Sequence, residues 1–183
     1  QAFLEKFVAK AQALTLGHGL KNPNIGAINS VRQLDRIAGM VDSARARGIR
    51  VATGGERAVD PDSGAGWFYR PTVLDEVPAA DPAAREEIFG PVLAVQVVDG
   101  AEQALAVAND SDYGLVACVY TRDIQKALSL ARDIDAGQIS VNQYFAGGIY
   151  TPFGGNKLSG FGREKGLEAL RNYCRVKNVT LRI

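Results

Sequence analysis

Apolar side chains recur at helical spacing in two stretches near the start of the chain. The first runs from Phe3 to Leu14, with glutamate and lysine on the opposite face. In the second, Ser30-Val-Arg-Gln33 has the pattern of a capping box and predicts a helix over residues 31–48. Short strands are predicted at residues 49–53 and 67–69, and the glycine and aspartate residues between them indicate a hairpin or an excursion of the chain.

After residue 90 the pattern becomes strand, helix, strand, helix, strand. Residues 92–98 and 115–120 are almost continuously apolar, as expected of strands buried on both faces. A capping-box variant predicts a helix over residues 99–109, a second helix over 124–137 uses Gly137 as its C′ residue, and a third strand covers 138–142. This order predicts an α/β fold with a mostly parallel open sheet, right-handed crossovers and flanking helices.

A glycine-rich loop follows the last of these strands. Binding sites in parallel sheets lie beyond the carboxyl ends of the strands, so the loop over residues 143–162 is a candidate site. A helix is predicted over residues 163–173, with Leu167 and Leu170 facing inward. The tail over residues 175–183 alternates apolar and polar positions, which predicts an amphipathic strand at the chain end.

Composition narrows the function classes. The chain has 183 residues, of which 46% are hydrophobic and 22% charged, with a net charge of +1. These values are typical of a globular protein with one domain or one domain and a short appendage. The near-neutral charge argues against nucleic acid and acidic membrane surfaces as partners. No apolar run reaches the about 20 residues that span a bilayer, and no signal-peptide pattern opens the chain, so we expect a cytoplasmic protein.

Cysteine and histidine, the usual nucleophiles and metal ligands, are rare in this chain. It has two cysteines and one histidine, too few for a disulfide framework or a zinc site, and we expect no metal site. Cys118 lies within an apolar run and is interpreted as an unreactive core residue, Cys174 follows a predicted helix, and His18 is interpreted as a loop residue. The glycines match neither a dinucleotide fingerprint nor a P-loop, and no nucleophile elbow occurs.

Spaced motifs nevertheless resemble one enzyme family over essentially the whole chain. Each is a short run in a fixed order: Arg85-Glu-Glu-Ile-Phe-Gly-Pro-Val92, Asn109-Asp-Ser-Asp-Tyr-Gly-Leu115, Ala136-Gly-Gln-Ile-Ser-Val-Asn142 and Pro152-Phe-Gly-Gly-Asn-Lys-Leu-Ser-Gly-Phe-Gly-Arg-Glu-Lys-Gly166, followed by Tyr173 and Lys177. Together they resemble the C-terminal part of the NAD(P)-dependent aldehyde dehydrogenases. Several motifs in the right order are far more specific than any one of them.

The resemblance implies how the chain would work. In that family a cysteine thiolate attacks the aldehyde, the thiohemiacetal gives hydride to the nicotinamide of NAD or NADP, and water releases the acid. The family's nucleophile, oxyanion-hole asparagine, general-base glutamate and dinucleotide-binding domain all precede the matched region. Residues 1–174 would be part of the catalytic domain, and residues 175–183 an oligomerisation strand of a homodimer or homotetramer. We therefore expect a fragment that is inactive alone.

Four residues match functional positions of the family. Glu87 matches the glutamate that binds the nicotinamide-side ribose, and Phe89 the aromatic residue that packs near it. Phe153 matches a wall of the aldehyde pocket, and Glu164 a glutamate implicated in proton relay. Each has a plainer alternative: a solvated first-turn glutamate for Glu87, a core ring for Phe89, a packing residue for Phe153 and an N-terminal helix glutamate for Glu164.

The resemblance suggests further roles around the loop. Lys157 and Gly160 resemble positions whose carbonyls bind a monovalent cation in some members. The small residues Ala146, Gly147 and Gly148 would enlarge the substrate entrance. The aromatics could attract a cationic substrate by cation–π contact, as in members acting on amino- or betaine-type aldehydes, or could be interface packing: Tyr144, Phe145 and Tyr150.

A different class of function also fits this sequence. The chain could be a stand-alone, non-catalytic homologue that acts as an assembly or binding module. The apolar helical pattern that begins at Gln1 without an N-cap argues against this alternative, because it indicates that Gln1 is not a native start. The residues encoded immediately upstream separate the two hypotheses.

Overall fold

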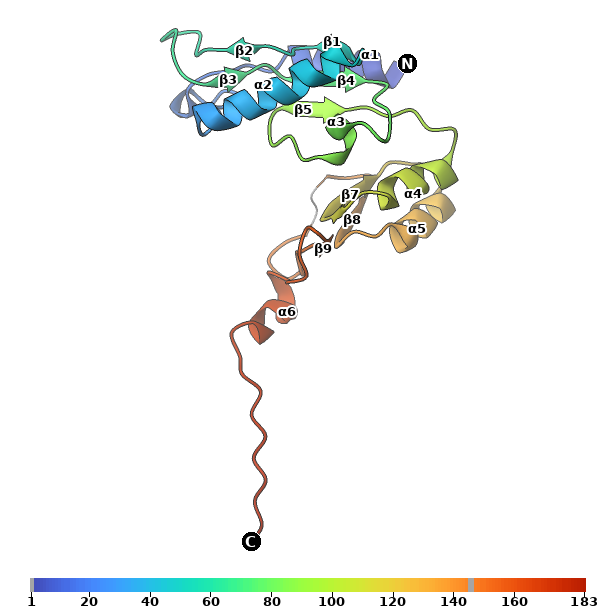
Figure 1. Cartoon of the computed structure of the whole chain (residues 1–183). Helices are drawn as coiled ribbons and strands as arrows, with labels where there is room; N and C mark the ends of the chain where they lie inside the picture. Colours follow the sequence, from blue (N-terminus) through green and yellow to red (C-terminus); the bar gives the residue numbers. More distant parts are fainter. Residues whose placement is uncertain (1, 145–146) are drawn as a thin grey trace. The chain divides into compact units, whose positions relative to one another are not determined.

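The computed structural model describes residues 2–144 and 147–183, and its contacts divide the chain into two compact units, Gln1–Val97 and Val98–Ile183 (Figure 1). The predicted mixed α/β class is confirmed, because helices and strands alternate in both units. Each unit has its own small sheets, and each is described by itself.

The first unit is built on a three-stranded sheet with the order β1-β4-β5. Strand β1 runs antiparallel to β4, whereas β4 runs parallel to β5. The helix α2 supplies the main apolar face, and its buried residues pack into one cluster with Tyr69, Leu74 and Ile88. The bounds are α1 (Ala2–Gln12), η1 (Gly19–Lys21), α2 (Val31–Ala46), β1 (Arg50–Thr53), β2 (Arg57–Ala58), β3 (Phe68–Tyr69), β4 (Thr72–Asp75), α3 (Pro82–Arg85) and β5 (Val92–Ala94).

Local sequence signals explain several of these elements. Ser30 caps α2, and its hydroxyl oxygen accepts a hydrogen bond of 3.2 Å from the Gln33 N–H, as the capping-box pattern predicts. Asp81 caps the short helix α3 by accepting from the Ala83 N–H at 2.8 Å, with Pro82 at the first helical position. A hairpin between residues 49–53 and 67–69 is not formed: β1 pairs with β4, and β3 pairs with β2, a strand that was not predicted, so residues 57–69 form an excursion between β1 and β4.

One strand of this unit was predicted too long, and another was missed. Strand β5 covers only Val92–Ala94 rather than residues 92–98, and its side chains are partly exposed. The reason is that β5 is an edge strand in this unit, so only β4 pairs with it. Strand β4 was not predicted, although all four of its residues are buried.

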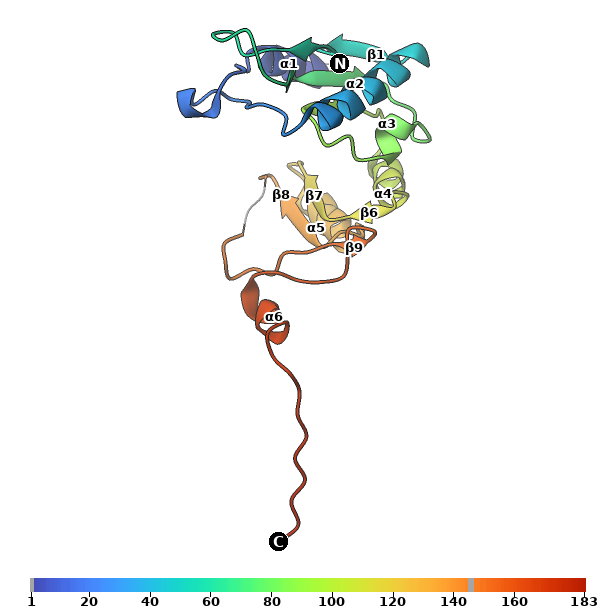
Figure 2. The ribbon, with the colours of Figure 1, turned by 60° about the vertical axis from the view of Figure 1, so that its left-hand side comes forward.

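The second unit contains a β-α-β arrangement. Strands β7 and β8 pair in parallel through the helix α5, which packs against both strands and against α4 (Figure 2). The loop after β8 returns to form β9, which pairs antiparallel with β6. The bounds are α4 (Ala101–Asn109), β6 (Tyr113–Gly114), β7 (Val116–Val119), α5 (Ile124–Asp133), β8 (Gln138–Val141), β9 (Asn156–Lys157) and α6 (Gly166–Arg171).

The predicted single, mostly parallel sheet is therefore not what the two units contain. Among the strand pairs of the described residues, β4–β5 and β7–β8 are parallel, whereas β1–β4, β2–β3 and β6–β9 are antiparallel. A parallel pair needs a crossover long enough to hold a helix, which α5 provides for β7 and β8. The connection between β2 and β3, residues 59–67, is too short for the crossover that a parallel pair would need, so the pair is antiparallel.

Helix ends in this unit also differ from the predictions. Helix α5 stops at Asp133, where the Ile134 N–H donates to the Leu130 carbonyl oxygen, so Gly137 is not its C′ residue. A Cβ at Gly137 would lie 1.7 Å from the Gly154 carbonyl oxygen, so this glycine permits close contact between two backbones. The N-cap of α4 shifts by one residue from the predicted Asp99 to Gly100, which has no side chain to cap the helix.

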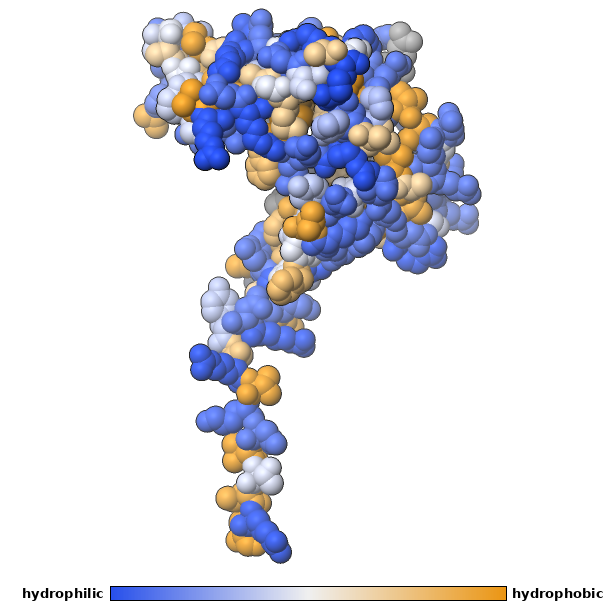
Figure 3. Space-filling view, viewed as in Figure 1, coloured by the Kyte–Doolittle hydropathy of each residue, from blue (hydrophilic) through white to orange (hydrophobic). Residues whose placement is uncertain are grey.

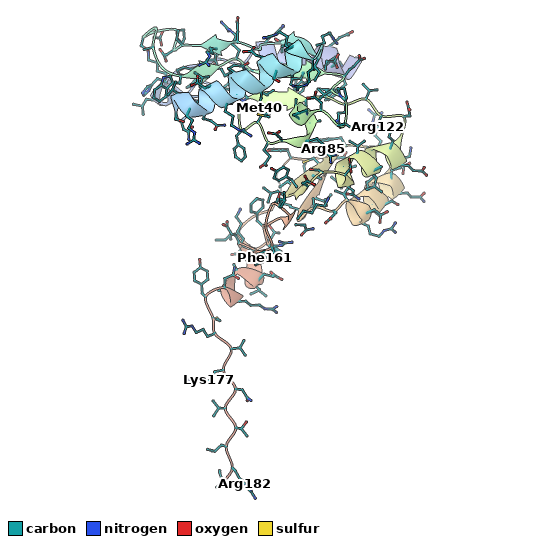
Figure 4. All side chains as sticks on the ribbon, in the orientation of Figure 1. Met40, Arg85, Arg122, Phe161, Lys177 and Arg182 are labelled. Atoms are coloured by element: carbon teal, nitrogen blue, oxygen red, sulfur yellow. The ribbon has the colours of Figure 1, made fainter. Side chains whose placement is uncertain are left out.

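The end of the chain departs most from the sequence patterns. Leu167 and Leu170 are 78% and 60% exposed, so the prediction that they face inward was wrong. Residues 175–183 form neither helix nor strand in this single chain, because no strand of the described residues lies beside them. Figure 3 shows apolar and polar side chains alternating along this tail, and Figure 4 shows its Lys177 and Arg182. No helix of the described residues is long and apolar enough to cross a bilayer.

Candidate functional site

The segment from Glu87 to Gly90 is an irregular connection between α3 and β5 in the first unit, and it is called the ribose turn below because Glu87 is predicted to bind a ribose. Ile88 is 8% exposed and belongs to the core, whereas Glu87 on one side is exposed and Phe89 on the other is 73% exposed. The backbone of Phe89 is left-handed, with φ of +56°. This conformation costs a bulky residue roughly 1–3 kcal/mol, so the surrounding structure must hold it.

Two side chains of α2 hold the ribose turn. The Arg36 Nη1 donates to the carbonyl oxygens of Glu87 and Ile88, at 2.7 and 2.9 Å. The Gln33 Nε2 donates to those of Ile88 and Phe89, at 3.3 and 3.1 Å. Sequence reasoning missed both residues, because a capping box predicts that Gln33 bonds back to the start of its own helix.

Gly90 closes this arrangement on the side of the core. A Cβ at Gly90 would lie 2.6 Å from the Cδ1 of Ile37, a fully buried side chain of α2. The glycine therefore lets the ribose turn approach the helix closely enough for the four hydrogen bonds to form. The core alternative for Phe89 is excluded within this unit, because its ring is exposed while the neighbouring Ile88 takes the buried position.

In the second unit the structure brings Phe153 and Glu164 together. The Phe153 N–H donates to the Glu164 carbonyl oxygen at 2.7 Å, and the Glu164 N–H donates to the Phe153 carbonyl oxygen at 2.6 Å. The Arg163 guanidinium braces the same loop by donating to the carbonyl oxygens of Gly155 and Gly162 and to the Asn156 side chain. The Lys165 ammonium lies 5.4 Å from the centre of the Phe153 ring.

These contacts rule out the plainer alternative for Glu164, whereas the functional roles of Phe153 and Glu164 stay predictions. Helix α6 begins at Gly166, so Glu164 lies before it and is not a first-turn glutamate. Its side chain is exposed, and the Phe153 ring is half-buried. Whether Phe153 and Glu164 serve substrate binding and proton relay stays a prediction.

The other loop residues also take defined positions. The Lys157 Nζ donates to the carbonyl oxygens of Asn109 and Ser111 at 2.8 and 3.0 Å. The rings of Tyr144 and Tyr150 are 78% and 90% exposed. Phe161, in the same glycine-rich loop, is fully exposed (Figure 4). Of the predicted entrance residues, Phe145 and Ala146 lie outside the described residues.

The two cysteines lie outside both the ribose turn and the glycine-rich loop. Cys118 lies in β7 and is partly buried, beside the buried Ser140 of β8. Cys174 is exposed after α6. Among residues 2–144 and 147–183, no group of three or more His, Cys, Asp or Glu side chains is placed to hold a metal ion.

A cavity of about 620 Å³ in the first unit is lined by His18, Lys21, Asp60 and Phe68 among others, and by no residue of the ribose turn. The Asp60 carboxylate accepts from the backbone N–H groups of Ser63, Asp62 and His18. The hydrogen bond from Ser63, the largest effect, holds the Asp60 pKa below its ordinary value. Asp60 thus fastens two loops to each other, and His18 is a loop residue, as predicted.

Comparison with known proteins gives consistent results. Residues 1–179 match the model of the aldehyde dehydrogenase family. A betaine aldehyde dehydrogenase of Cereibacter sphaeroides is 40% identical over 98% of this chain and 36% of its own length. A succinate semialdehyde dehydrogenase [NAD(P)+] of Escherichia coli is 39% identical over 97% of this chain and 38% of its own length.

Solved structures agree with these sequence relatives. An indole-3-acetaldehyde dehydrogenase in complex with NAD+ superimposes with a TM-score of 0.91 at 37% identity. The superposition covers 96% of this chain and 35% of the solved one. The chain thus spans about a third of the length of the relatives it matches.

Proposed function

Because this chain belongs to the aldehyde dehydrogenase family, we propose that it is the C-terminal part of an enzyme that oxidises an aldehyde to a carboxylic acid with NAD(P)+. The observation that carries the proposal is the match of nearly the whole chain to about a third of the length of enzymes named for this activity, together with the exposed, braced positions of Glu87 and Phe89.

The nucleophile is proposed to lie outside residues 1–183. Family chemistry uses a cysteine thiolate, which must be accessible to the aldehyde. Cys118 is part of a strand, and Cys174 lies in the exposed segment after α6, away from the glycine-rich loop motif. The relatives' additional length is about twice that of this chain, which leaves room for a nucleophile and a dinucleotide-binding domain.

The exposed side chains of the ribose turn fit a nicotinamide cofactor. A carboxylate such as Glu87 can accept hydrogen bonds from both vicinal hydroxyls of a ribose. The exposed Phe89 ring offers an apolar surface beside it. A bound nicotinamide would accept the hydride from the substrate. The contribution of this chain is to hold the ribose and, through Phe153 and Glu164, to form one wall of the aldehyde pocket and carry a proton.

The aldehyde itself is proposed only as a class. The exposed rings of Tyr144 and Tyr150 suit a cationic substrate, as in betaine aldehyde oxidation. The Lys165 ammonium over the Phe153 ring instead suits a neutral or anionic one. A panel of betaine aldehyde, succinate semialdehyde and indole-3-acetaldehyde therefore tests the specificity.

We further propose that the tail mediates assembly of a cytoplasmic homodimer or homotetramer. Val179, Leu181 and Ile183 are exposed at alternate positions, and an apolar strand of this kind is stable when another chain covers it. Both cysteines are free thiols, which is compatible with a reducing compartment. Deleting residues 175–183 from the full-length polypeptide should convert its oligomer to monomers, as measured by light scattering.

The test uses two proteins: the 183-residue chain and its parent polypeptide, meaning the product of the reading frame that contains it. The parent should form NADH or NADPH when given an aldehyde, and the chain alone should not. Oxidation by the chain alone would contradict the proposal. A reading frame with a start codon at this point and no upstream cysteine would favour the alternative, a non-catalytic assembly or binding module.

A further inference from the structure

We propose that Lys165 is a specificity-determining residue that selects an aldehyde with a carboxylate at the opposite end of the molecule. The inference rests on the proposed function, in which the Phe153 ring forms a wall of the aldehyde pocket. The Lys165 ammonium lies 5.4 Å from the centre of that ring, within the distance of about 6 Å over which an aromatic face attracts a cation. The wall of the pocket therefore carries a positive charge.

The backbone of Lys165 has a conformation that is rare for a residue with a side chain. Its φ is +60° and its ψ is 174°, a region that glycine populates almost alone because a Cβ is crowded there. Glycine would take the same backbone conformation without strain. A lysine at this position therefore indicates a use for its side chain.

Hydrogen bonds on both sides of Lys165 hold this conformation. The Phe153 N–H donates to the Glu164 carbonyl oxygen at 2.7 Å, which holds the peptide plane before Lys165. The Gly166 N–H donates to the Ile149 carbonyl oxygen at 2.8 Å, which holds the peptide plane after it. These two planes set φ and ψ of Lys165, so the direction in which its side chain leaves the backbone is fixed relative to Phe153.

The charges of Lys165 and Arg163 serve different purposes. The Arg163 guanidinium donates to two carbonyl oxygens of the loop and to the Asn156 side chain, so it braces the loop. The Lys165 ammonium instead lies over a ring that the substrate is proposed to contact. Lys165 is half-buried, so water and salt screen its charge less than they screen a charge at the surface.

This charge favours one class of aldehyde over another. The ammonium attracts a carboxylate at the far end of a substrate, whereas it repels a quaternary ammonium and already occupies the Phe153 ring that could have bound one. At about 6 Å and an effective dielectric constant of about 20, one such charge changes an affinity by about 100-fold. Water around the half-buried Lys165 should reduce this to roughly 30-fold.

The test measures kcat/KM of the parent polypeptide for succinate semialdehyde, neutral butyraldehyde and betaine aldehyde. Lys165→Met removes the charge and keeps the length of the side chain. It should lower kcat/KM for succinate semialdehyde about 30-fold, raise it for betaine aldehyde about tenfold and change it for butyraldehyde less than about twofold. Lys165→Arg keeps the charge and should stay within about threefold of the wild type for all three aldehydes. The control Lys126→Met, at an exposed position of α5, should leave all three values unchanged.

Two outcomes would overturn the inference and leave the proposed function standing. They are equal changes for all three aldehydes in Lys165→Met, and wild-type values for all three, in each case with butyraldehyde still oxidised. A parent polypeptide that oxidises none of the three aldehydes would overturn the proposed function as well.

A second measurement separates this role from a structural one. Lys165→Gly relieves the strained backbone, so the urea midpoint of the parent polypeptide should equal or exceed that of the wild type, while the preference for succinate semialdehyde is lost as in Lys165→Met. A lower midpoint together with an unchanged preference would mean that Lys165 serves stability alone, which would overturn the inference.

Discussion

Phe153 and Glu164 are joined through both of their backbone N–H groups, at 2.7 and 2.6 Å, across a loop of ten intervening residues. The pair places one predicted substrate residue directly beside one predicted proton-relay residue. It exists because the glycines of the loop allow backbone to pass against backbone: a Cβ at Gly154 would lie 2.1 Å from the Gly162 carbonyl oxygen.

Replacing Gly154 by alanine should therefore break the pair, whereas the matched change Gly162→Ala should not. No heavy atom lies within 4 Å of a Cβ built on Gly162. Overpacking of this kind costs roughly 2 kcal/mol, which corresponds to about a 30-fold faster local opening. Amide hydrogen exchange at Phe153 and Glu164 measures it. Equal exchange in the two variants would contradict the close approach.

The proposed proton relay predicts a specific effect of Glu164→Gln in the parent polypeptide. The backbone pair with Phe153 does not depend on the side chain, so folding and NAD+ affinity should be unchanged. Loss of a titratable carboxylate should lower kcat about 100-fold and flatten its dependence on pH. A variant with wild-type kcat would show that Glu164 carries no proton in the rate-limiting step.

The buried hydroxyl of Tyr69 leads us to expect that its removal stabilises the fold. Its side chain is 1% exposed, and its hydroxyl has no hydrogen-bond partner among the described residues. Tyr69→Phe removes a buried, unsatisfied polar atom and keeps the ring, so the free energy of unfolding should stay equal or rise by about 1 kcal/mol. Urea denaturation measures this, and a loss of stability would indicate a polar partner for the hydroxyl.

Burial of Tyr69 also predicts that the free energy of unfolding falls at alkaline pH. Burial raises the pKa of Tyr69 from 10.0 to about 12. Since the unfolded chain releases this proton first, the stabilisation is complete below pH 10 and is lost as pH rises from 10 to about 12. The loss should reach roughly 2 kcal/mol and should disappear in Tyr69→Phe. The control Tyr173→Phe, at an 89% exposed position, should keep the wild-type profile.

The ion pair of Asp81 predicts that the free energy of unfolding falls in acid, whereas burial of Tyr69 lowers it in alkali. Its carboxylate accepts two hydrogen bonds from Arg47, at 2.7 and 2.8 Å, and these hold the Asp81 pKa below its ordinary value of 3.8. The stabilisation is therefore present above pH 3.8 and is lost as pH falls through the lowered folded value.

Asp81→Asn keeps the cap of α3 but removes the charge, so it should cost roughly 2 kcal/mol at neutral pH and less in acid. Denaturation curves at neutral and acid pH measure the difference. The control Asp62→Asn, in an exposed pair with Lys21, should leave the midpoint unchanged. Equal effects of the two substitutions would contradict a special role for the buried carboxylate.

Prediction from the sequence worked best where the signal is local. The cap at Ser30 and the order strand, helix, strand from β7 to β8 follow from short sequence patterns, and both are confirmed. The motifs around Glu87 and Phe153 led to the family, because fixed residue types in a fixed order carry that information without any knowledge of their contacts.

The sequence by itself determined the α/β class, the family and the positions of the candidate residues, because helix periods, caps and motifs are short-range. Only the tertiary structure decided what Gln33 bonds to, that Phe89 is left-handed and exposed, and that Phe153 meets Glu164. These features depend on contacts between residues that are far apart in the chain, such as Gln33 with Phe89 or Gly137 with Gly154. Their contacts arise only once packing has brought the elements together, so no local pattern encodes them.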